Sequence, residues 1–104
     1  MRYPRPLRKG GTIGFLAPSF GCATEPYRSL FLHAQDIWKE KGYQLLLGPN
    51  CYASEGVGIS SLPEKCGAEV MELFLSDADC LISCGGGELM CEILPYVDFQ
   101  RLAR

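Results

Sequence analysis

The chain has 104 residues, of which 47% are hydrophobic and 21% are charged, and its formal net charge is -2 at pH 7. These values are typical of one soluble globular domain, which we expect to span residues 1–104. Basic residues are outnumbered and form no stripe, and no apolar stretch is long enough to cross a membrane. We therefore expect no nucleic-acid partner, no membrane partner and a cytoplasmic location.

The cysteine content could indicate disulfides or zinc. The six cysteines are Cys22, Cys51, Cys66, Cys80, Cys84 and Cys91. No Cys-x-x-Cys pair occurs and His33 is the single histidine, so the spacing of a zinc site is missing. We expect no metal and no cofactor, and we interpret the cysteines as reduced, buried, small apolar residues.

The first predicted strand covers residues 12–17 and ends at Pro18. The loop that follows carries Ser19, which is interpreted equally well as a ligand contact or as part of a plain connection. Residues 27–41 are predicted to form a helix that begins near Pro26 and ends at Gly42. The residues expected on the apolar face of this helix are Leu30, Ala34, Ile37 and Trp38.

A second strand is predicted over residues 43–47, followed by a glycine-containing loop over residues 51–59 that we expect to be mobile. A second helix should run from about Ser61 to Leu75, with Ser61 as its cap and Glu64 at capping-box spacing. Its packing candidates are Ala68, Met71, Leu73 and Phe74, and its expected exposed row is Glu64, Glu69 and Glu72.

A third strand is predicted over residues 80–84, and its apolar run favours burial on both faces. Gly85, Gly86 and Gly87 follow and allow another group to approach the main chain closely. Helical spacing then begins at Leu89 and stops at Pro95. A strand, a glycine turn and a helix start form the usual site architecture of an open α/β sheet.

Strands that alternate with helices predict an α/β fold in three layers, with a mostly parallel sheet and helices on both faces. The three strands correspond to a Rossmann-like or flavodoxin-like half. So small a sheet leaves an open edge and an uncovered face, which favours a homo-oligomer.

Three segments in this order resemble the serine LD-carboxypeptidases, which trim murein tetrapeptides, and their relatives that give immunity to microcin C. The segments are residues 10–19, 63–77 and 86–98. The resemblance covers the N-terminal domain of such a peptidase, and it implies that the C-terminal domain is absent from this chain.

In that family, a serine nucleophile begins the helix after the Gly-Gly turn, five positions before a proline. Its general base is a histidine oriented by a glutamate, both from the C-terminal domain. The matching position here is Met90, and methionine cannot attack a carbonyl. Cys91 is the alternative nucleophile, but adjacent helix positions point about 100° apart. Its backbone N–H could still serve as an oxyanion donor.

The resemblance therefore implies the fold and ligand crevice of a hydrolase that acts on L,D-peptide bonds of peptidoglycan, without catalytic competence in this chain alone. The expected ligand is a murein-type peptide or an aminoacyl compound, bound by Ser19, Gly86, Gly87 and Glu88. The alternative is a non-catalytic peptide-binding or self-associating module. A nucleotide-binding half-domain is disfavoured, because the three consecutive glycines do not form a Gly-x-Gly-x-x-Gly pattern.

Overall fold

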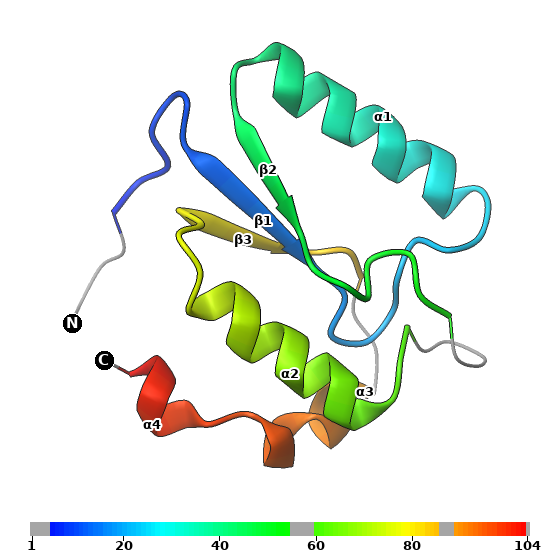
Figure 1. The fold of residues 1–104 in the computed structure, drawn as a ribbon. Coiled ribbons are helices and arrows are strands. Elements are labelled where there is room, and N and C mark those ends of the chain that lie inside the picture. Colours follow the sequence, from blue (N-terminus) through cyan, green and yellow to red (C-terminus); the bar gives the residue numbers. More distant parts are fainter. Residues whose placement is uncertain (1–4, 55–59, 86–88, 104) are drawn as a thin grey trace.

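The computed structural model describes residues 5–54, 60–85 and 89–103. Three parallel strands, β1 (Thr12–Leu16), β2 (Gln44–Leu47) and β3 (Cys80–Ser83), form one sheet in the order β2-β1-β3 (Figure 1). The two longer helices are α1 (Tyr27–Glu40) and α2 (Pro63–Phe74). The chain continues through α3 (Leu89–Glu92), a 3₁₀ turn η1 (Leu94–Tyr96) and α4 (Phe99–Leu102). The predicted α/β fold is confirmed.

The central strand β1 separates two apolar cores. Ile13 and Phe15 face α1 and pack with Phe31, whose ring meets the Phe15 ring edge-on at 5.2 Å between centroids. Leu16 faces the other way and packs with residues of α2, including Val70 and Leu73. Because successive side chains of a strand point to opposite faces, this alternation gives the three-layer arrangement of helix, sheet and helix.

The glycine at the centre of β1 allows α2 to approach the sheet closely. A Cβ atom at Gly14 would lie 2.7 Å from a methyl group of Leu81 and 2.9 Å from one of Leu73. A side chain at this position would therefore separate the helix from the strands.

The buried face of α1 agrees with the predicted one only in part, since Trp38 packs against the core. The buried residues of α1 are Phe31 and Gln35, whereas Leu30 is 62% exposed and Ile37 is 38% exposed. The physical reason is that Phe31 contacts both Phe15 and Tyr52. The side of α1 that faces the sheet is therefore centred on Phe31 and Gln35, one position along the chain from Leu30 and Ala34.

The start and the surface of α2 also differ from the predictions. The N-cap position is Leu62, with Pro63 in the first turn, and no side chain caps the helix, so the predicted Ser61 capping box is wrong. Among the predicted packing residues, Leu73 is buried but Phe74 is 55% exposed. Glu69, expected on an exposed row, is only 1% exposed.

The third strand is half-buried rather than buried on both faces, because β3 lies at an edge of the sheet. The glycine loop and most of the predicted mobile loop, residues 86–88 and 55–59, lie outside the described residues. In the part of the chain that is described, no helix is long and apolar enough to span a membrane.

Candidate functional site

The candidate site lies at the carboxyl ends of β1 and β3. The chain goes from β1 to β2 on one side and returns to β3 on the other, so the strand order reverses at β1. Open α/β sheets bind ligands at such a reversal, because the loops after the two strands separate there. The loop after β1 carries Ser19, and the loop after β3 begins with Cys84 and Gly85.

A buried carboxylate connects two of the loops at this end of the sheet. Glu69 of α2 accepts hydrogen bonds from the backbone N–H of Ala17 at 2.6 Å and of Asn50 at 2.7 Å. The Asn50 side chain in turn donates to the Lys65 carbonyl at 3.1 Å. Glu69 thus fixes the loop after β1 and the loop after β2 to the same helix.

Burial raises the pKa of the Glu69 carboxyl, and the two N–H donors, from Asn50 and Ala17, lower it in part. Gly48 makes room for this group, since a Cβ atom there would lie 2.5 Å from a carboxylate oxygen of Glu69. A glycine after β2 is therefore a steric requirement of the buried carboxylate.

Ser60 holds the loop that contains Ser19. The Ser60 hydroxyl donates to the Ala17 carbonyl at 2.7 Å, and the Ser60 N–H donates to the Ser19 carbonyl at 2.7 Å. The hydroxyl of Ser19 itself is fully buried and has no hydrogen-bond partner among the described residues. A buried hydroxyl without a partner is energetically costly, which makes it a candidate contact for a bound group.

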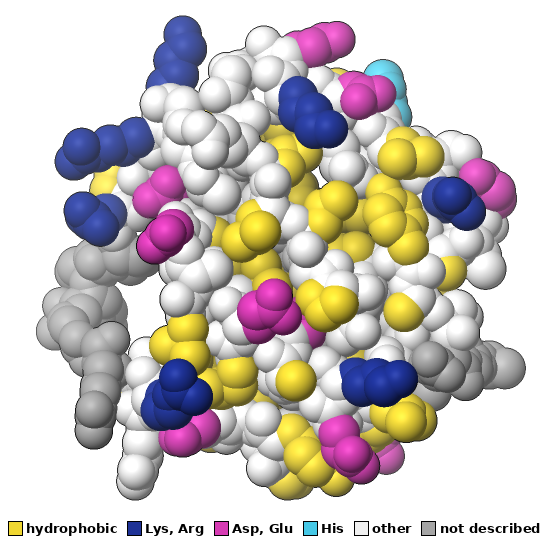
Figure 2. Space-filling view, in the orientation of Figure 1, with side chains coloured by type: hydrophobic (Ala, Val, Ile, Leu, Met, Phe, Trp, Pro, Cys, Tyr) yellow, Lys and Arg dark blue, Asp and Glu magenta, His cyan; other side chains and the backbone are white. Residues whose placement is uncertain are grey.

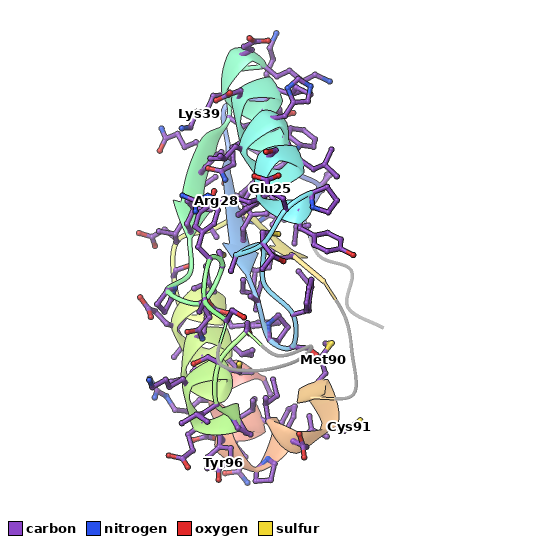
Figure 3. The ribbon with its side chains drawn as sticks, turned by 90° about the vertical axis from the view of Figure 1, so that its right-hand side faces the viewer. Glu25, Arg28, Lys39, Met90, Cys91 and Tyr96 are labelled. Carbon is purple, nitrogen blue, oxygen red and sulfur yellow. The ribbon has the colours of Figure 1, made fainter. Side chains whose placement is uncertain are left out.

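Met90 and Cys91 lie side by side on α3 and leave it in different directions (Figure 3). Met90 is 40% exposed and lines an apolar cavity of about 320 Å³ together with Leu16, Pro18 and Ile93. Cys91 is exposed. The thioether of Met90 therefore belongs to an apolar surface, with no described acid or base beside it.

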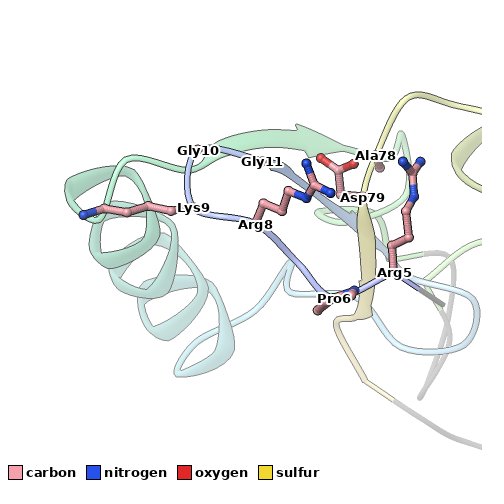
Figure 4. A pocket seen from close by; sticks show the side chains of 8 residues that line it. All are labelled: Arg5, Pro6, Arg8, Lys9, Gly10, Gly11, Ala78 and Asp79. Atoms are coloured by element: carbon pink, nitrogen blue, oxygen red, sulfur yellow. The ribbon is translucent and has the colours of Figure 1, made fainter. Parts of the chain in front are cut away.

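A different cavity, of about 430 Å³, lies at the opposite ends of the strands (Figure 4). It is lined by Arg5, Arg8 and Lys9, and by Asp79, whose carboxylate accepts the Thr12 N–H at 2.9 Å. Because it opens at the amino ends of β1 and β3, it lies at the opposite end of the sheet from Ser19.

Of the predicted site residues, the structure describes Ser19, Met90 and Cys91, whereas Gly86, Gly87 and Glu88 lie outside the described residues. Glu69 was missed as part of the site. A signal for it exists, since Glu69 is three residues after Cys66 and four before Leu73, at the helical spacing of a buried face. Within residues 5–54, 60–85 and 89–103, no group of three or more His, Cys, Asp or Glu side chains is arranged to hold a metal ion.

Solved structures with this fold include the microcin C7 self-immunity protein MccF in complex with glutamyl sulfamoyl guanosine and with aspartyl sulfamoyl adenosine. Each is 28% identical to this chain with a TM-score of 0.83, and the match covers 93% of this chain and 29% of MccF. A muramoyltetrapeptide carboxypeptidase from Oxalobacter formigenes is 22% identical with a TM-score of 0.67, over 88% of this chain and 29% of the other.

A Vibrio cholerae protein whose name assigns it a carboxypeptidase activity is 30% identical in an alignment 104 residues long, which covers 98% of this chain and 30% of that protein. This chain thus spans about 30% of the length of that relative. Residues 13–104 match the family model described as the LD-carboxypeptidase N-terminal domain. Because this match takes in most of the sequence, the chain belongs to the LD-carboxypeptidase family, in the part that forms the N-terminal domain.

Proposed function

We propose that this chain binds a small peptide or aminoacyl ligand in the crevice between the loops after β1 and β3, and that alone it does not hydrolyse the ligand. The observation that carries the proposal is Met90. At the position where the family resemblance expects a nucleophilic serine, the chain has a thioether that lines an apolar cavity. A thioether carries no proton to lose and forms no stable acyl intermediate, so the first step of acyl transfer has no nucleophile there.

Among the described residues, no histidine lies on α3 or on the loops after β1 and β3 to act as the base of this reaction. His33, the single histidine of the sequence, is exposed on α1, and the described residues of α3 lie on a different element. General-base catalysis requires a base within hydrogen-bond reach of the nucleophile. Without a nucleophile and a base, the chain keeps the fold of a hydrolase domain and its binding surface.

The relatives indicate the ligand class. MccF has been solved with aminoacyl sulfamoyl nucleosides, in which an amino acid is joined to a nucleoside. We extend this to the present chain as an aminoacyl or short peptide ligand, with the unpartnered Ser19 hydroxyl as a contact for one of its polar groups.

The first test is hydrolysis of a murein tetrapeptide, with mass spectrometry to follow the terminal D-alanine. We expect the D-alanine to stay in place, at the rate of the peptide in buffer alone. Release at an enzymatic rate would contradict the proposal. If Cys91→Ala abolished that release, Cys91 would be the nucleophile in place of the missing serine.

The second test is binding of aspartyl sulfamoyl adenosine, measured by isothermal titration calorimetry. Ser19→Ala should weaken binding by about fivefold, the equivalent of one hydrogen bond of about 1 kcal/mol. Ser29→Ala is the matched control, since Ser29 lies on the exposed surface of α1 and its hydroxyl donates to the Glu25 carboxylate. Equal affinity for the wild type and Ser19→Ala would remove Ser19 from the site.

A second function is favoured by the apolar cavity beside Met90. It is bordered by Phe74 and Phe99, which are 55% and 58% exposed. Large exposed aromatic residues around an apolar hollow are typical of a protein–protein contact. We propose that this surface joins two copies of the chain.

A further inference from the structure

Two adjoining cavities begin at the amino end of β3, at the opposite end of the sheet from Ser19. The first, of about 430 Å³, is lined by charged residues, and the second, of about 400 Å³, is lined mainly by apolar ones. Both are lined by Arg5, Ala78 and Asp79, so they adjoin at these residues. Each volume lies within the range of small-molecule sites, about 300–1,000 Å³. A charged compartment and an apolar compartment are thus joined on one side of the sheet.

The charged cavity has an excess of positive charge. Arg5, Arg8 and Lys9 line it together with one carboxylate, that of Asp79, although the whole chain has a net charge of -2. Arg5 and Arg8 lie on either side of Asp79, whereas the Lys9 side chain extends away from it (Figure 4). Within residues 5–54, 60–85 and 89–103, neither guanidinium has an ion-pair partner. The two arginines are therefore available to donate hydrogen bonds to an anionic group.

Backbone hydrogen bonds hold the two sides of the charged cavity in place. On one side, the Gly11 N–H donates to the Arg8 carbonyl at 2.9 Å, in a turn where Gly10 has a φ of 84°. On the other side, the Asp79 carboxylate accepts the Thr12 N–H at 2.9 Å, and the Asp79 N–H donates to the Thr12 carbonyl at 2.8 Å. Both sides are thus fixed to the beginning of β1.

The apolar cavity continues from this point along the edge strand β3. Among the described residues that line it, only Arg5 and Asp79, at the boundary with the charged cavity, carry a charge. Its apolar lining includes Leu81, which is half-buried, and Phe74, which is 55% exposed. An apolar group that occupied this cavity would remove both side chains from water, which favours binding.

We propose that the two cavities bind a small molecule with an anionic head and an apolar tail, of the class of medium-chain fatty acids. Its carboxylate accepts hydrogen bonds from Arg5 and Arg8, and its tail lies along β3 against Phe74 and Leu81. The four residues of β3 extend over about 13 Å, which limits the length of the tail. A small polar anion would leave the apolar cavity exposed to water, and a neutral lipid would leave the arginines without an anionic partner.

The first experiment titrates the isotope-labelled chain with decanoate and follows the backbone amide shifts by NMR. We expect saturable shifts centred on Gly11, Asp79 and Leu81. Acetate has the same head without the tail, and decylammonium has the same tail with the opposite charge, so each should bind at least about tenfold more weakly. Decylammonium that bound as tightly as decanoate would exclude an anion site, and the absence of any saturable shift with decanoate would overturn the whole proposal.

Two variants test the head of the ligand. Arg8→Gln should weaken the binding of decanoate by about threefold, the size of effect expected for one exposed ion pair. Asp79→Asn keeps an oxygen for the Thr12 N–H but removes the negative charge, so it should tighten binding by about threefold, a gain that damage to the fold does not produce. Lys39→Gln is the control, since Lys39 is exposed on α1 and lines neither cavity. Equal affinities of all these proteins would overturn the role of the arginines.

A third variant tests the tail. Phe74→Asp places a charge in the apolar cavity and should weaken the binding of decanoate by about tenfold. Leu75→Asp is the matched control, because Leu75 is 47% exposed and lines neither cavity. Since Phe74 also borders the cavity beside Met90, the positions of the shifts in the wild type separate the two cavities. Shifts confined to Met90 and Leu102 would place the tail there and overturn the proposal, even if a variant fails to fold.

Discussion

Glu69 is the residue on which the arrangement of the loops depends most directly. Its two carboxylate oxygens accept the N–H groups of Ala17 and Asn50, which follow two different strands. Glu69→Ala would leave both N–H groups buried without a partner, at a cost of about 1–3 kcal/mol each. We expect the free energy of unfolding to fall by about 3 kcal/mol or more, as measured by urea denaturation.

Glu64→Ala is the matched control, because Glu64 lies on the same helix but is exposed. It should change the free energy of unfolding by no more than about 0.5 kcal/mol. Equal effects of the two substitutions would show that the buried hydrogen bonds of Glu69 contribute nothing net to stability.

The same carboxyl predicts a pH dependence of stability. Its pKa in the folded protein is raised from about 4.5, so the folded state holds the proton more tightly than the unfolded state. The stability that this proton supplies is fully present below about pH 4.5 and is lost as the pH rises through the folded pKa. The free energy of unfolding of the wild type should therefore decrease with pH across this window.

Glu69→Gln cannot titrate and should lack this decrease, whereas Glu64→Gln should keep it. Urea denaturation of the three proteins at intervals between about pH 4.5 and about pH 8 measures the difference. Parallel curves for the wild type and Glu69→Gln would contradict the raised pKa.

At the scale of elements, the sequence predicts the strands and the two long helices well. Each of these elements carries its own periodicity and is bounded by proline or glycine, such as Pro18 and Gly42. Both signals come from neighbouring residues in the sequence, so they do not depend on what the elements pack against. For the same reason, strand β1 and helix α1 begin at their predicted first residues.

The faces of the elements were predicted less well, because packing partners decide them. Phe31 rather than Leu30 is buried on α1, since its ring meets Phe15 and Tyr52 from other elements. Glu69 was placed on the exposed side of α2 because a carboxylate is rarely buried. Only the two N–H groups from distant loops, which no local pattern reveals, make its burial tolerable.

In the candidate site, too, the features that depend on adjacent residues were predictable and those that depend on packing were not. Strand β3 and the helix start at Leu89 were predictable from residues that adjoin one another, although α3 is only four residues long. The unpartnered hydroxyl of Ser19 and the contact between the loops of Cys22 and Cys51 were not. Both depend on which loops meet at the reversal of strand order, and that is a property of the whole sheet.

At the scale of the molecule, the described residues form a three-stranded sheet, and within them β2 and β3 each have one unpaired edge. The radius of gyration is 13.8 Å, against about 13 Å for a compact chain of this length. Hydrophobic side chains also reach the surface between α1 and α2 (Figure 2). On the edge strand β2, Leu46 is 38% and Leu47 is 40% exposed. A thin sheet with open edges and exposed apolar groups favours association.

We therefore expect the chain to form dimers or larger assemblies, measured by light scattering over a range of concentrations. Phe99→Asp places a charge at the rim of the apolar cavity and should raise the dissociation constant by about tenfold or more, because desolvating the carboxylate opposes the contact. Leu32→Asp is the matched control, since Leu32 is 46% exposed on α1 and does not line that cavity. A wild-type monomer at high concentration would exclude self-association. A dimer that Leu32→Asp weakens as much as Phe99→Asp would place the contact on another surface.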